Sequence, residues 1–338
     1  MDGMKLSESQ VGVSYNLQLM RFFAALGVVF HHSFILSTGS MDREWLSAAT
    51  GGQLTFGLVS VGLFFLAGGY LIAGSAQKSS SFFSFLKRRL MRLIPPLLAV
   101  NTVVIVVCCA FSSLPAARYF CHPDTWKYLL NSVFILRHDL PGVFTENVYA
   151  RTVNGALWTM PVEFGCYVFC YLVKAVFGFR KKSYAITLPL AGAGIAVGVL
   201  LQKRIPFLSA MLLPCIFFYL GMTIWVYKEY IHLNRLLFVA ACAVMVIGCM
   251  FGVGKAALLI GMTYAVFYLS YGVRQIPKRW GAGGFWSYGI YLWAFPLQQM
   301  IIQGFGGQMN SYVNFAISAP IVCVGGALIY HLIEKKRG

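Results

Sequence analysis

The chain has 338 residues, of which 59% are hydrophobic and only 11% are charged. A soluble domain of this length carries about a quarter charged residues, so this composition excludes a water-soluble globular protein and indicates a membrane protein. The formal net charge of +17 does not indicate a nucleic-acid partner, because the basic residues cluster between apolar runs, as the positive-inside rule predicts.

Ten apolar stretches reach about the 20 residues that a membrane helix needs. They predict an all-α membrane protein with about ten transmembrane helices, arranged as a single transmembrane domain over residues 1–338. In chain order the predicted spans are 17–38, 54–76, 93–113, 157–178, 183–201, 207–227, 235–252, 255–273, 284–303 and 312–332. No small-residue cleavage site follows the first span, so we interpret it as retained. The short connection 252–255 predicts a tight helical hairpin.

Lysine and arginine are unevenly distributed between the connections on alternate sides of these spans. Seventeen fall on the side that holds both termini, and eight fall on the other side. The positive-inside rule therefore predicts that both termini are cytoplasmic, which agrees with an even number of spans.

The longest connection, residues 114–156, is then expected on the extracytoplasmic face. It mixes aromatic residues, among them Trp126, with histidines and acids. Long ordered loops in compact proteins are often functional, and this composition suits contact with a sugar. The alternative is an interfacial lid whose aromatic residues only anchor it at the membrane surface.

Four charged or titratable residues lie deep in the predicted spans: Arg21, His31, His32 and Glu163. Such residues are rare in membranes and are candidates for a functional site. Lys174 lies near a cytoplasmic span end, where its side chain can reach the interface. His32 and Glu163 each lie about six residues from the outer end of their span, roughly 9 Å, so they can share one level of the bilayer. A histidine beside a carboxylate suits a general base, whereas the alternative is a buried pair that only joins two helices. Glu334, at the end of the last span, is expected to be solvated.

Arg21 precedes His32 by eleven residues, roughly 16 Å along a helix axis. Arg89 and Arg92 share one helix face, and Arg88 enlarges this cationic cluster. A guanidinium group suits phosphate oxygens, although such clusters are usually positive-inside anchors. Acyl-coenzyme A fits this spacing between the arginines and His32, because it carries phosphates at one end and a thioester on a long arm. The nine cysteines and the histidines form no set at metal-ligand spacing, so no metal site is expected.

Four segments, taken in order, resemble the integral-membrane acyltransferase-3 family. They are "RFFAALGVVFHH", "SVGLFFLAGGYLI", "FLKRRLMRLIPP" and "LWTMPVE", with weaker support from "SYGIYLWAFPL" and "HLIEK". The resemblance covers almost the whole chain. The sequence departs from the family pattern at Gly68, Phe164 and Ala294, where serine, a second acid and histidine are common.

The resemblance implies transfer of an acyl group, usually acetyl, from acetyl-coenzyme A to a hydroxyl of an extracytoplasmic acceptor. Family acceptors are commonly bacterial surface polysaccharides such as the O-antigen of lipopolysaccharide, or lipid-linked oligosaccharides at the inner membrane. The implied catalytic residues are His32 and Glu163. The implied donor-binding residues are Arg21, Arg88, Arg89 and Arg92, and the candidate acceptor contacts are Trp126, Trp158 and His31.

Two other readings remain open on the residues alone. An intramembrane histidine–glutamate pair also suits a proton-coupled transporter or a flippase of lipid-linked sugar, although no inverted repeat is visible. A structural scaffold in a glycan-assembly complex is the third. Mutation of the arginine cluster and of Glu163 discriminates among the three.

Overall fold

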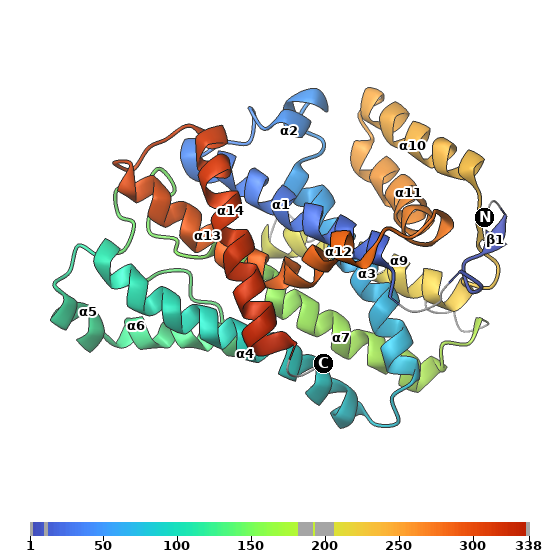
Figure 1. The fold of residues 1–338 in the computed structure, drawn as a ribbon, viewed down its shortest axis with the longest axis horizontal. Coiled ribbons are helices and arrows are strands. Elements are labelled where there is room, and N and C mark those ends of the chain that lie inside the picture. The colour runs from blue at the N-terminus through green and yellow to red at the C-terminus, as the bar shows by residue number, and fades with distance from the viewer. Residues whose placement is uncertain (1–2, 10–12, 182–191, 193–205, 336–338) are drawn as a thin grey trace. The chain divides into compact units, whose positions relative to one another are not determined.

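The computed structural model describes residues 3–9, 13–181, 192 and 206–335 (Figure 1). The predicted span 183–201 lies outside these residues, apart from residue 192. The helices of the described part are α1 (Tyr15–Thr38), α2 (Trp45–Ala49), α3 (Phe56–Gln77), α4 (Phe82–Cys108), α5 (Ala116–Cys121), α6 (Pro123–Lys127), α7 (Thr159–Phe177), α9 (Pro206–Tyr227), α10 (Arg235–Met250), α11 (Gly254–Phe267), α12 (Lys278–Gly281), α13 (Ser287–Gly304) and α14 (Ser311–Ile329). The strands β1 (Met4–Lys5) and β2 (His232–Leu233) form one short antiparallel pair. The all-α fold class is confirmed.

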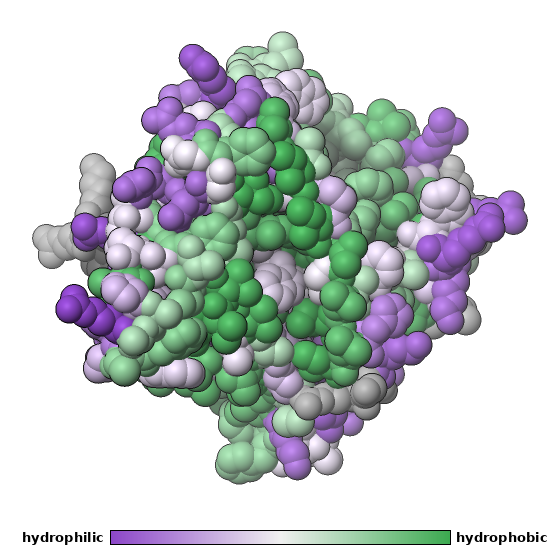
Figure 2. Space-filling view, turned by 60° about the vertical axis from the view of Figure 1, so that its left-hand side comes forward, coloured by the Kyte–Doolittle hydropathy of each residue, from purple (hydrophilic) through white to green (hydrophobic). Residues whose placement is uncertain are grey.

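Six helical segments of the described residues are long and apolar enough to cross a membrane. They are Tyr15–Thr38, Phe56–Gln77, Phe82–Phe111, Gly155–Phe177, Ala210–Tyr227 and Ser311–Glu334. Figure 2 shows broad hydrophobic areas on one face of the molecule, with hydrophilic side chains gathered toward its edges. The chain is therefore a multi-pass membrane protein, whereas ten spans and cytoplasmic termini stay predictions.

Helix α4 begins at Phe82, well before the span predicted at 93–113. The basic segment before that span is helical, because lysine and arginine are good helix formers. Pro95 and Pro96 lie inside this helix. The cationic residues are therefore presented by a regular helix and not by a loop.

The chain divides into two compact units, each made of three segments. The first unit contains Met1–Gln18, Val61–Arg88 and Val162–Gly281. The second unit contains Leu19–Ser60, Arg89–Pro161 and Ala282–Gly338.

Close helix contacts in the first unit depend on glycine. A Cβ atom on Gly69 would lie 2.0 Å from the carbonyl oxygen of Phe218, and one on Gly221 would lie 2.1 Å from that of Leu66. Small residues at such positions let membrane helices approach closely, so α3 and α9 pack backbone against backbone. The predicted hairpin is confirmed, because α10 and α11 lie side by side (Figure 1).

A buried polar network on α13 organises the second unit. The Nε2 atom of Gln299 donates hydrogen bonds to the carbonyl oxygens of Tyr149 (2.6 Å) and Thr152 (2.9 Å). Asn147 Nδ2 donates in turn to the Gln299 backbone oxygen at 3.0 Å. Buried polar groups must be hydrogen-bonded, so this network fixes the end of the long connection against α13.

Candidate functional site

Helix α1 carries both histidines on consecutive residues of the second unit. The ring centroids of His31 and His32 are 5.8 Å apart. The ring of His32 packs edge-on against Phe295 of α13, with 5.2 Å between centroids. Its Nδ1 atom is buried and has no hydrogen-bond partner within the described residues. Within the described residues, His32 is therefore held by packing against Phe295 and not by a hydrogen bond.

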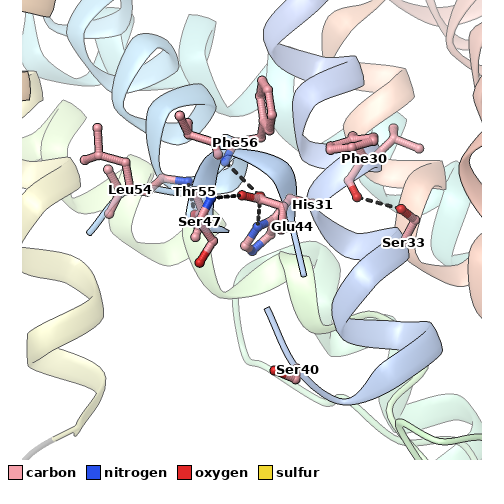
Figure 3. Close-up of polar contacts among 12 residues, drawn as sticks. Phe30, His31, Ser33, Ser40, Glu44, Ser47, Leu54, Thr55 and Phe56 are labelled. Carbon is pink, nitrogen blue, oxygen red and sulfur yellow. Dashed lines mark hydrogen bonds and ion pairs between the residues drawn. The ribbon is translucent and has the colours of Figure 1, made fainter. Parts of the chain in front are cut away.

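His31, in contrast, has a carboxylate partner, Glu44, in the connection between α1 and α3. The distance from His31 Nδ1 to Glu44 Oε1 is 3.0 Å. The same oxygen accepts the backbone N–H of Phe56 at 2.8 Å, and Oε2 accepts that of Ser47 at 3.1 Å. Figure 3 shows the imidazole ring and both backbone nitrogens converging on this carboxylate.

The Glu44 carboxylate lies in the protein interior among hydrogen-bond donors. Its side chain is 0% exposed, and glutamate is almost never fully buried unless it is paired. It caps the start of α2 and receives the first N–H of α3, so two helix N-termini face the negative charge. A carboxylate only accepts hydrogen bonds, so the proton of the 3.0 Å contact belongs to His31 Nδ1.

Glycine at position 57 makes room for the His31 ring. A Cβ atom there would lie 2.5 Å from Cδ2, 2.6 Å from Cγ and 2.7 Å from Nε2 of His31. Real Cβ atoms do not approach other atoms so closely, so the Cγ–Cδ2–Nε2 edge of the ring occupies the space that a side chain at position 57 would fill. Gly57 and Glu44 together fix the orientation of the imidazole.

Sequence reasoning missed Glu44. Its only signal is that Glu44 and Asp42 are the two acids in the connection 39–55. Sequence reasoning named Glu163 as the carboxylate instead. Glu163 belongs to the first unit, where the hydroxyl of Tyr167 donates to its Oε1. His32 belongs to the second unit, so the pairing of His32 with Glu163 stays a prediction.

The structure brings a second group of charges together at the other end of α1. Arg21 of α1 and Arg92 of α4 both act electrostatically on the carboxyl group of Glu334. The expectation of a solvated Glu334 is wrong, because its side chain is partly covered and its Oε1 is buried without a hydrogen-bond partner in the described part of the chain. Arg89 lies on α4 three residues before Arg92, and its Nε atom is also buried.

Arg88 is part of the first unit, and its guanidinium group is hydrogen-bonded to two nearby serines. Its guanidinium group donates to Ser84 Oγ at 2.7 Å and to Ser79 Oγ at 2.5 Å. These bonds join the start of α4 to the turn that precedes it. Its predicted role in donor binding stays a prediction.

The two tryptophans occupy different settings in the second unit. Trp126 of α6 is exposed, and its Nε1 donates to the carbonyl oxygen of Phe120 at 2.8 Å. Trp158 ends the short helix Gly155–Trp158, which leads into α7, and is partly buried. Among the described residues, no three His, Cys, Asp or Glu side chains form a group that could hold a metal ion.

Comparison with known proteins places the whole arrangement in one family. Residues 14–332 match the acyltransferase-3 family model, which describes an acyltransferase domain. The chain is also similar to an O-acetyl transferase of Shigella phage Sf6, with 26% identity over 325 residues, which cover 94% of this chain and 93% of the relative. No solved structure matches the chain. Since the family match spans almost all of the chain, the protein belongs to the acyltransferase-3 family of membrane acyltransferases.

Proposed function

We propose that the protein is an O-acetyltransferase of the bacterial inner membrane. It takes an acetyl group from acetyl-coenzyme A at the cytoplasmic face and transfers it to a hydroxyl of a polysaccharide or lipid-linked oligosaccharide on the other face. The observation that carries the proposal is the layout of α1. Arg21 lies toward one end, where it and Arg92 both act electrostatically on Glu334, and the histidine pair follows ten and eleven residues later. The name of the phage relative supports the acetyl group and the oxygen acceptor.

The donor site of this proposal is the arginine cluster. The phosphates of coenzyme A are held by Arg21, Arg89 and Arg92, because guanidinium groups form bidentate hydrogen bonds with phosphate oxygens. Arg88 contributes positive charge at the same helix end. From Arg21 to His32 the helix rises roughly 16 Å, a length that the pantetheine arm of the donor can span.

The transfer step requires a group that accepts a proton. In the proposal His32 removes the proton from the acceptor hydroxyl as its oxygen attacks the thioester carbonyl. A carbon–oxygen bond forms, the carbon–sulfur bond breaks, and the coenzyme A thiolate leaves and takes up the proton. Glu163 is the carboxylate predicted to orient His32, and Trp126, Trp158 and His31 are the proposed acceptor contacts.

Transfer in a defined system tests the proposal. Purified protein in liposomes is given radiolabelled acetyl-coenzyme A and a surface polysaccharide from which esters have been removed by mild base. We expect label in the polysaccharide with the wild-type protein and none with His32→Ala, although both insert into the membrane. Equal labelling by His32→Ala contradicts the assigned base, and no labelling by wild type contradicts the proposed reaction.

A further inference from the structure

The Glu44 carboxylate contacts two backbone N–H groups as well as His31, and Gly57 makes room for the His31 ring. We infer that Glu44 is a positioning residue for the sugar acceptor, which fixes His31 so that its Nε2 atom accepts a hydrogen bond from an acceptor hydroxyl. This inference rests on the proposed function and deepens it, because it assigns a residue and a hydrogen-bond direction to acceptor recognition.

The first support is the contrast in exposure within the pair. The Glu44 side chain is fully buried, whereas that of His31 remains 22% exposed. A substrate therefore cannot reach the carboxylate but can reach the imidazole. Because Glu44 is held by Ser47 and Phe56 as well, it is a fixed support and not a second ligand.

The second support is the tautomer that the carboxylate imposes. With the proton on Nδ1, the neutral imidazole carries a lone pair on Nε2, which accepts hydrogen bonds. His31 makes no other hydrogen bond within the described residues. Every sugar hydroxyl is a donor, so Nε2 suits this class of ligand. Gly57 holds the ring against α3, so the direction of the lone pair is also fixed.

The third support is the neighbouring histidine. The ring centroids of His31 and His32 are only 5.8 Å apart, and sugars carry hydroxyls on adjacent carbons. One hydroxyl can therefore meet His31 while its neighbour meets His32, the proposed base. The pair thus selects an acceptor with two adjacent hydroxyls, one for each imidazole ring.

Nuclear magnetic resonance tests the geometry without any variant of Glu44 and without an acceptor. The protein is labelled with ¹⁵N-histidine in lipid nanodiscs, and the His31 signals are assigned by their loss in His31→Gln. We expect His31 to show a protonated Nδ1 and an unprotonated Nε2. A protonated Nε2 overturns the inference, with Nδ1 bare or protonated, whatever reaction the protein catalyses.

Kinetics in the liposome assay test the role. Glu44→Gln and His31→Ala are compared with Asp42→Asn, which changes an exposed acid two residues from Glu44. We expect the KM for the polysaccharide to rise about tenfold in the first two variants, which corresponds to one lost hydrogen bond. The KM for acetyl-coenzyme A and the kcat should stay within about twofold, and Asp42→Asn should match wild type. His31→Gln, which retains a hydrogen-bond acceptor at the end of the side chain, should recover part of the loss.

The possible results distinguish a failure of the inference about Glu44 from a failure of the proposed acetyl transfer. If wild type transfers acetyl groups and Glu44→Gln has an unchanged polysaccharide KM, the inference is overturned and the proposed function stands. If both KM values rise together and thermal stability falls, Glu44 is structural, and the inference is again overturned. If wild type transfers nothing, the proposed function fails first.

Discussion

Gly57→Ala should disturb the imidazole of His31 without altering any polar side chain. The new Cβ atom would lie 2.5–2.7 Å from three ring atoms, so the ring must move away from α3. Movement of the ring lengthens or breaks the 3.0 Å bond between His31 Nδ1 and the buried Glu44 carboxylate. The substitution therefore combines overpacking with the loss of a charge-assisted hydrogen bond.

The magnitude follows from these two effects. Overpacking of a filled site costs about 1–3 kcal/mol, and a hydrogen bond to a charged group contributes about 1.5–3 kcal/mol. Replacing a helical glycine by alanine returns about 1 kcal/mol through helix propensity. We therefore expect Gly57→Ala to lower the free energy of unfolding by about 2–5 kcal/mol.

Equilibrium unfolding in mixed micelles measures this free energy. Gly165→Ala is the matched control, because Gly165 also lies in a helix and a Cβ there meets nothing within 4 Å. In a His31→Ala background the ring is absent, so the cost of Gly57→Ala should nearly vanish. If Gly57→Ala is as stable as Gly165→Ala, or costs the same with and without the His31 ring, the described packing is refuted.

The remaining predictions concern the two ends of α1 and the connection 114–156. Acetyl-coenzyme A should raise the thermal midpoint of the wild-type protein, and the shift should disappear in Arg89→Gln/Arg92→Gln; a persistent shift excludes these arginines as the donor site. Glu334→Gln removes a negative charge that acts on Arg92 and Arg21, so calorimetric titration should show tighter donor binding, and weaker binding would contradict a competing role for this carboxylate. Gln299→Leu removes both side-chain bonds to the connection 114–156, so limited proteolysis should cut residues 144–154 faster, whereas unchanged cleavage would show that the connection is held elsewhere.

Much of the fold could be predicted because membrane helices are encoded locally. A run of apolar residues predicts a span wherever it occurs, and the short connection 252–255 predicts a hairpin from length alone. The start of α4 could not be placed, because its basic residues form a helix as readily as a loop. The close packing at Gly69 and Gly221 could not be predicted either, because each glycine contacts the backbone of a helix far away in the chain.

In the candidate site, too, some residues could be predicted from the sequence and one could not. Arg21 and His32 were found because both interrupt an apolar run at a measurable spacing. Glu44 was not found, because an acid in a polar connection looks ordinary until the connection folds back onto His31. The tertiary contact also changes the interpretation of the adjacent histidines, since the one with a carboxylate partner in the second unit is His31.

Acetyl transfer to a surface glycan is the central step of the proposed function, and mass spectrometry of that glycan measures its product. Glycan is compared from cells that contain the wild-type protein, the His32→Ala variant at equal membrane abundance, or no protein. We expect O-acetyl groups only with the wild-type protein. Identical acetylation in all three samples would contradict the proposed transfer.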